Sequence, residues 1–445
     1  MGMPSPETVS PKLERIAKLA KEAPGLAITS LSHHIDVAWL REAHRRTRKD
    51  GALGVDGQSA EMYEAKLEEN LRSLLDRAKS GTYRAPPVKR VHIPKGDGSQ
   101  TRPIGIPTFE DKVLQRAVAM ALEAVYEQDF LDCSYGFRPG RGAHQALEAL
   151  QRDLVWRAGG WILEVDIRKF FDTLDHARLR EILHRRVRDG VLLRLIGKWL
   201  NAGVLESGEL SFPVAGTPQG GVISPLLANV YLHEVLDEWF EREVKPRLGG
   251  HAALFRYADD FVIVFAREED ARRVWDVLPK RFGKYGLTLH PDKTKLTEFR
   301  RPDRRSPRKG DADHGRQTFD LLGFTHRWGQ SRRGKWVVKR RTASDRLSRG
   351  LKKITEWCRQ NRHLPVKQQA RTLSQKLRGH FGYFGIIGNS DALSTFRENV
   401  VCIWRKWLGR RSNSQRMTWD RMALLLKGHP LPPARIPSSR AFQYA

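Results

Sequence analysis

Residues 254–265 read LFRYADDFVIVF, two short apolar runs on either side of the tripeptide Ala258-Asp259-Asp260. Runs rich in β-branched and aromatic residues are typical of strands, so the pattern predicts a β-hairpin with acidic residues at its turn. Two adjacent carboxylates oppose strand propensity there, and such a local conflict indicates a functional constraint. For Asp260, hydrogen bonding within the turn is the alternative explanation.

A third carboxylate ends another apolar run, Ile162-Leu163-Glu164-Val165-Asp166. Carboxylate oxygens that converge from two strands suit Mg²⁺, and two such ions about 4 Å apart catalyse phosphoryl transfer. Asp172 and Asp175 follow closely, but Asp175 directly precedes a helical pattern and is expected to cap it. We leave both out of the expected metal site.

Composition narrows the class of protein. The 445 residues correspond to roughly three packing units, and 79 Lys or Arg against 51 Asp or Glu give a net charge of +28, which favours a polyanionic partner. No apolar stretch approaches the roughly 20 residues of a membrane span, and the first 30 residues form no apolar signal core, so we expect no membrane association and a cytoplasmic location. The three cysteines are widely separated, which disfavours disulfides and structural zinc.

The chain also changes character along its length. The pattern is helical up to about Gly81, with Ser59 as an expected N-cap, and Pro- and Gly-rich sequence from residue 86 introduces strands and turns. A polar loop is expected over residues 301–315. An amphipathic basic helix follows around residues 393–407. Residues 300–380 hold 24 Lys or Arg against 6 Asp or Glu, which predicts contact with phosphates.

Seven ordered motifs cover nearly the whole chain. They are Gly54-Val55-Asp56-Gly57; Ile93-Pro94-Lys95 with Arg102-Pro103-Ile104-Gly105-Ile106-Pro107; Ser134-Tyr135-Gly136-Phe137-Arg138-Pro139; Asp166 with Phe170-Phe171-Asp172; Gly216-Thr217-Pro218-Gln219-Gly220-Gly221; Tyr257-Ala258-Asp259-Asp260; and Leu321-Leu322-Gly323-Phe324. With them the chain resembles the reverse transcriptase and maturase proteins of bacterial group II introns.

The resemblance implies an α/β fold of the right-hand polymerase type, in which fingers and a palm surround an antiparallel sheet and an α-helical thumb follows. We expect an N-terminal helical extension at 1–84, fingers and palm at 85–300, and the palm end with a basic linker at 301–339. The thumb, called domain X, is expected at 340–430 and a tail at 431–445.

The resemblance also implies roles for individual residues. Asp166 and Asp259 would bind two Mg²⁺ ions, with Asp260 in support and the backbone of Ile167 assisting, and Lys293 would give a proton to the departing pyrophosphate, with Lys295 as a competitor for that role. The residues expected at the incoming dNTP are Lys95, Arg102, Phe171 and Gln219. Phe171 would exclude a ribose 2′-hydroxyl, although plain core packing is the alternative for this ring. For Lys95 the alternative is an ordinary surface base.

Basic residues are expected to hold RNA in preference to aromatic ones, because aromatics at helical spacing more often belong to a core. The expected RNA-binding residues are Arg138, Arg378, Arg405, Lys406, Arg410 and Arg411. The implied partners are a group II intron RNA, an RNA template with a DNA primer, dNTPs and target DNA, in a bacterial, nucleoid-associated setting. Only 26 residues follow Trp419, without a Cys pair, so we expect no HNH endonuclease and priming from an existing DNA 3′ end.

The expected function is therefore RNA-directed DNA synthesis combined with maturase work, in which the protein assists intron splicing and mobility. One alternative is a domesticated enzyme in host defence or repair, which an inspection of the flanking DNA for an intron would distinguish. Another is an RNA-binding splicing cofactor without polymerase activity. The intact acids at 166 and 259 argue against the second, because a carboxylate cluster without metal is costly to keep.

Overall fold

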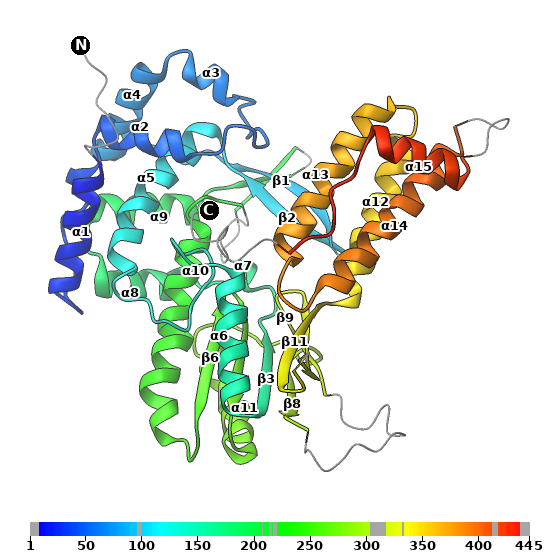
Figure 1. Ribbon diagram of the computed structural model, residues 1–445. Coiled ribbons are helices and arrows are strands. Elements are labelled where there is room, and N and C mark those ends of the chain that lie inside the picture. Colours follow the sequence, from blue (N-terminus) through cyan, green and yellow to red (C-terminus); the bar gives the residue numbers. More distant parts are fainter. Residues whose placement is uncertain are drawn as a thin grey trace. The chain divides into compact units, whose positions relative to one another are not determined.

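The computed structural model describes residues 9–95, 100–206, 208–212, 216, 220–302, 317–331, 333–411 and 417–436. The chain divides into two compact units. One comprises Met1–Leu150 and Trp161–Leu296, and the other comprises Gln151–Gly160 and Thr297–Ala445. Figure 1 shows the helices and strands of both along the sequence.

The first unit contains most of the helices. In chain order they are α1 (Ser10–Glu22), α2 (Val37–Arg46), α3 (Ala60–Glu64), α4 (Leu67–Ser80), α5 (Phe109–Tyr126), α6 (Ala143–Trp156), α7 (Phe170–Thr173), α8 (His176–Arg186), α9 (Gly190–Leu200), α10 (Ser224–Leu232) and α11 (Glu268–Gly283). The last turns of α6 belong to the second unit. After α10 the chain continues in π-helical turns, His233–Glu238 and Phe240–Val244.

Two four-stranded sheets accompany these helices. The first has the order β2-β1-β4-β5 and is formed by β1 (Val88–Lys95), β2 (Gln100–Ile106), β4 (Val204–Glu206) and β5 (Glu209–Ser211). The second has the order β6-β7-β3-β8 and is formed by β3 (Gly159–Asp166), β6 (Ala252–Tyr257), β7 (Asp260–Phe265) and β8 (Lys295–Arg300). Residues 159–160 of β3 and 297–300 of β8 belong to the second unit. The pairings of β1 with β2, of β6 with β7 and of β3 with β7 are antiparallel, whereas β1 and β4 run parallel.

Local sequence accounts for several of these elements. Ser59 caps α3 by accepting a hydrogen bond from Met62 N, and Gly81 ends α4 with a φ of 88°, as the sequence predicts. Asp175 caps α8, which confirms its structural role. Most residues of α5 are buried in the core of the unit, and three of its partly exposed charged residues, Lys112, Arg116 and Glu123, lie on one face of the helix.

The second unit combines a small sheet with a helical bundle. Its antiparallel sheet has the order β11-β10-β9, from β9 (Phe319–Leu321), β10 (Phe324–Gln330) and β11 (Trp336–Thr342). The helices are α12 (Ser344–Gln360), α13 (Val366–Phe384), α14 (Ser390–Leu408) and α15 (Trp419–Gly428), and Figure 1 shows α12, α13 and α14 packed together. The amphipathic helix predicted at 393–407 is α14, which buries Leu393 and Val400 completely.

A mixture of small sheets and helices, with helices toward the C-terminus, agrees with the predicted α/β class. The right-hand arrangement and the domain boundaries at 84, 300, 339 and 430 stay predictions. Within the described residues, no helix is both long and apolar enough to cross a membrane.

Candidate functional site

Three acidic residues meet at one end of the second sheet. β7 lies between β6 and β3, and the register of β3 with β7 pairs Asp166 with Asp260. Tyr257 pairs with Asp260 across the hairpin, so Ala258 and Asp259 form a two-residue turn. The predicted hairpin is confirmed. Its acidic turn stands beside the strand end that carries Asp166.

The charges of these residues influence one another. Burial raises the pKa of Asp259 above its usual range, and the negative charge of Asp166 raises it further, while the positive charge of Arg102 opposes this shift. Asp166 is more accessible, with 40% of its side chain exposed, and its carboxylate accepts a hydrogen bond from Lys293 Nζ at 2.9 Å. Asp260 is exposed. The cluster therefore combines a half-buried carboxylate, a more accessible one and an ammonium group.

Such a donor set suits a divalent cation. In the described part of the chain, no group of three or more His, Cys, Asp or Glu side chains already stands at ligand spacing. Carboxylates at the ends of paired strands nevertheless supply the oxygen ligands that Mg²⁺ prefers, and the ammonium of Lys293 already acts as a counter-ion to Asp166. Ile167, the expected backbone ligand, follows Asp166 directly and forms a β-bridge with Leu289.

A buried arginine supports the acidic turn. Arg256 is completely buried, and its guanidinium binds both carboxylate oxygens of Asp237, at 2.7 and 2.5 Å. The same guanidinium donates to the carbonyl of Ala258 in the turn, at 3.1 Å, and to Asn229 Oδ1, at 2.9 Å. The fifth acceptor atom is Ser134 Oγ, at 2.8 Å. This network ties the turn to three other segments of the unit.

This network was not predicted from the sequence, although the sequence contains an indication of it. Arg256 interrupts the otherwise apolar strand β6, and a charged residue in a buried strand requires a partner. The backbone of the turn is also strained, because Ala258 has a φ of 56°, a left-handed conformation that alanine rarely adopts.

The structure describes part of the expected nucleotide site. Arg102 is exposed on β2, and its charge acts on Asp259. Phe171 is half-buried in α7, its ring 5.3 Å from that of Phe170, and it packs at the margin of the core. Lys95 ends β1, but its side chain lies outside the described residues, as does Gln219.

Gly216 and Gly220, which flank the Gln219 loop in the chain, lie close to other parts of the backbone. Gly216 N donates to Leu174 O at 2.9 Å, and a Cβ at Gly216 would lie 2.9 Å from Phe171 O. At the other end, a Cβ at Gly220 would lie 2.5 Å from Gly105 O. The loop therefore begins beside α7 and ends against β2, which are the elements that carry Phe171 and Arg102.

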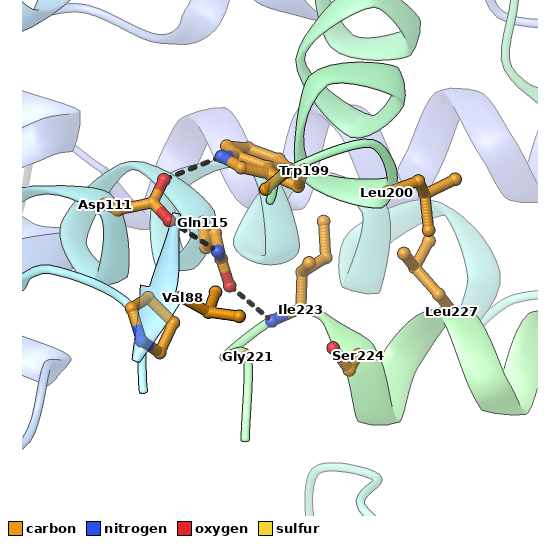
Figure 2. Close-up of a pocket in the computed structure, with 11 residues that line it drawn as sticks. Val88, Asp111, Gln115, Trp199, Leu200, Gly221, Ile223, Ser224 and Leu227 are labelled. Carbon is orange, nitrogen blue, oxygen red and sulfur yellow. Dashed lines mark hydrogen bonds between the residues drawn. The ribbon is translucent and has the colours of Figure 1, made fainter. Parts of the chain in front are cut away.

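A buried polar chain holds the segment that follows this loop. Trp199 Nε1 donates to Asp111 at 2.7 Å, Gln115 Nε2 donates to the other oxygen of Asp111 at 3.0 Å, and Gln115 Oε1 accepts from Val222 N at 2.8 Å. Figure 2 shows Asp111, Gln115 and Trp199 around a cavity of about 20 Å³, which has room for about one water molecule. Tyr83 Oη also donates to Asp111. Sequence reasoning did not find this chain of contacts.

The expected RNA-binding residues fall into two groups. Arg138 was a wrong prediction, because only 6% of it is exposed and its guanidinium binds Glu127, at 2.9 Å, and the carbonyls of Leu131 and Ser134. The charge of Arg138 is neutralised inside the protein. We therefore remove Arg138 from the RNA-binding set.

The remaining five basic residues lie in the second unit. Arg405 is half-buried, donates to Met417 O at 3.0 Å and stacks on Trp419, with its guanidinium 4.2 Å from the ring centroid. Arg411 donates to the carbonyls of Arg362 and Leu364. Four of the five are exposed to solvent: Arg378, Lys406, Arg410 and Arg411.

Two family models and several known proteins match the sequence of this chain. Residues 93–326 match the family model of the reverse transcriptase (RNA-dependent DNA polymerase), and residues 347–425 match that of the group II intron maturase-specific domain. The chain is 35% identical over 328 residues to protein YkfC of Escherichia coli strain K12, across 65% of this chain and 84% of YkfC. It is 37% identical over 249 residues to the group II intron-encoded protein LtrA of Lactococcus lactis subsp. cremoris, across 53% of this chain and 40% of LtrA.

The two matched regions follow one another along the chain. The first contains Asp166, Asp259 and Lys293, and the second contains most of the helical bundle of the second unit. The chain therefore belongs to the family of group II intron reverse transcriptases with a maturase domain.

Proposed function

We propose that this reverse transcriptase extends a DNA primer on an RNA template, with Asp166 and Asp259 binding two Mg²⁺ ions and Asp260 supporting them. The observation that carries the proposal is the pairing of Asp166 with Asp260 across β3 and β7, next to the turn that holds Asp259. The influence of Asp166 on the pKa of Asp259 supports it, because two carboxylates that repel each other favour a bound cation.

In this reaction the primer's 3′ oxygen attacks the α-phosphorus of a dNTP, and pyrophosphate leaves. The bound ions would activate the attacking hydroxyl and stabilise the leaving group. Lys95 and Arg102 would hold the triphosphate, since guanidinium and ammonium groups bind phosphate oxygens well. Phe171 would close the sugar pocket to a 2′-hydroxyl, and Gln219 would contact the incoming nucleotide.

Lys293 would have two roles in this reaction. Its ammonium neutralises Asp166 at 2.9 Å before substrate binds. When pyrophosphate departs, the same group would donate a proton to it. Lys295 begins β8 two residues later and is the alternative donor.

We propose further that the maturase domain binds the intron RNA through Arg378, Lys406 and Arg410, with Arg405 and Arg411 in a more structural role, and so assists splicing and mobility. The contacts support this division, because Arg405 is half-buried and donates to Met417 O, and the exposed Arg411 donates to the carbonyls of Arg362 and Leu364. Target DNA, a primer from an existing DNA 3′ end and a bacterial, nucleoid-associated setting are parts of the same proposal.

Primer extension on an RNA template with Mg²⁺ and dNTPs tests the polymerase proposal. Asp166→Asn and Asp259→Asn should each lower the rate at least about 100-fold, because each removes a ligand charge from the reaction centre. Asp276→Asn is the matched control, since Asp276 is an exposed carboxylate on α11 in the same unit. Full activity of the Asp166 variant would contradict the proposal. A wild-type protein that binds RNA without extending primers would favour the splicing cofactor.

A further inference from the structure

Phe137 combines two unfavourable features. Its side chain is 55% exposed, and its backbone is left-handed, with a φ of 54°. Bulky residues are genuine outliers in that conformation, which glycine or asparagine adopts far more readily. Neither feature helps the chain to fold, and strained residues of this kind concentrate at functional sites.

The residues on either side hold Phe137 in place. Gly136 lies against the acidic turn so closely that a Cβ there would clash with the backbone of Ala258, and its carbonyl accepts a hydrogen bond from Asn229 Nδ2 at 2.6 Å. Arg138 is locked by its buried ion pair with Glu127. The aromatic ring is thus presented to solvent by a fixed backbone.

The exposed ring stands next to the reaction centre. Its centroid lies 5.9 Å from that of Tyr257, with the rings tilted by 44°. Tyr257 is the last residue of β6 and pairs with Asp260, so only the turn residues Ala258 and Asp259 separate it from β7. Phe137 and Tyr257 therefore form an aromatic surface beside the carboxylates.

The basic residues close to Phe137 in the chain are already paired with acids. The arginines that follow Phe137 are both ion-paired, Arg138 with Glu127 at 2.9 Å and Arg141 with Asp132 at 2.5 Å. Their charges are already balanced, which disfavours a triphosphate as the occupant. An aromatic face suits the flat face of a base or the apolar side of a sugar, and such stacking tolerates any sequence.

We propose that Phe137 is a positioning residue that stacks against a nucleoside of the primer–template duplex next to the primer's 3′ end. This inference rests on the proposed polymerase function. The strain at Phe137 is retained because the contact aligns the primer terminus with the acidic turn. A purely structural role is the alternative, in which the ring only covers Tyr257.

The two roles predict opposite effects of Phe137→Gly on stability. Glycine adopts the left-handed conformation without strain, so loss of a ring that serves only the nucleic acid should leave the Tm unchanged or raise it. Loss of a ring that covers the core should lower the Tm. Ala158→Gly is a matched control for strain relief, since Ala158 has a φ of 60° and no aromatic ring.

The experiment measures primer–template affinity by fluorescence anisotropy without dNTPs, and then the KM for dNTP and kcat by primer extension. Phe137→Gly should weaken primer–template affinity about tenfold, with the dNTP KM changed by less than about twofold. Phe137→Tyr, which keeps an aromatic ring, should have the affinity of the wild type, and Ala158→Gly should leave the affinity unchanged.

Unchanged affinity in Phe137→Gly, or a lower Tm with unchanged affinity, would overturn the assignment. A weakened dNTP KM with normal duplex affinity would also overturn it, because the ring would then serve the incoming nucleotide. These outcomes are separate from failure of the polymerase proposal, which shows as a wild-type protein that extends no primer, since the anisotropy measurement requires no synthesis.

Discussion

Replacement of Arg256 by methionine should both destabilise the first unit and stop DNA synthesis. The substitution keeps an apolar stem of similar length but leaves the Asp237 carboxylate, which is completely buried, without its bidentate partner. Removing one member of a buried ion pair typically costs about 3–5 kcal/mol. The carbonyl of Ala258 loses its donor at the same time, so the turn that carries Asp259 is less well held.

The double variant Arg256→Met, Asp237→Leu separates these effects. With both charges removed, the desolvated carboxylate no longer penalises the fold, and the remaining loss should be about 1–2 kcal/mol from unsatisfied partners such as Asn229 Oδ1. Urea unfolding followed by tryptophan fluorescence gives the four free energies of the double-mutant cycle. Synthesis should stay low in both variants, because neither restores the donor to Ala258. A double variant less stable than Arg256→Met, or normal synthesis by Arg256→Met, would refute the reasoning.

Three further predictions concern a buried acid and two exposed bases. Burial raises the pKa of Asp111 from its usual 3.8 to about 6, so the folded protein binds this proton more tightly than the unfolded chain, and stability is lost as the pH rises between these values. Asp111→Asn should therefore gain stability relative to the wild type by about 2 kcal/mol between pH 4 and pH 7, as measured by urea unfolding at both values. Lys406→Ala should lower the slope of log affinity for RNA against log salt by about one unit, as measured by filter binding. Arg411→Ala should instead lower the Tm, because it removes donors to Arg362 O and Leu364 O.

Local patterns in the sequence predicted the parts of the site that depend on neighbours along the chain. The hairpin at residues 252–265 follows from two apolar runs around an acidic turn, and the caps at Ser59 and Asp175 follow from side chains that bond to the next turn of backbone. The hydrophobic pattern does not specify which strands pair, so it could not by itself predict that Asp166 lies beside the turn. The chemistry of three carboxylates at strand ends suggested a shared metal site, and the resemblance of ordered motifs supported that expectation.

The contacts that the sequence did not reveal join distant segments. Arg256 binds Asp237 and Ser134, which are 19 and 122 residues away, and no periodic pattern indicates such a pair. Arg138 shows the converse error, because a basic residue in a family motif suggested RNA, whereas Glu127 lies close enough to neutralise it. Partner choice for a charged side chain is decided by tertiary packing.

Burial therefore divides the arginines of this protein into two classes with different physical roles. Three of the almost fully buried arginines, Arg138, Arg186 and Arg256, are each paired with an acid, respectively Glu127, Asp129 and Asp237, at 2.9 Å or closer, and Arg340 is a fourth buried arginine. These pairs add nothing to the net charge of +28. The excess lies instead in residues such as those of 300–380, where 24 basic residues face 6 acidic ones. The three buried pairs hold the catalytic unit in shape, and only the exposed arginines can release counterions from RNA, so the salt dependence of RNA binding should follow the exposed arginines alone.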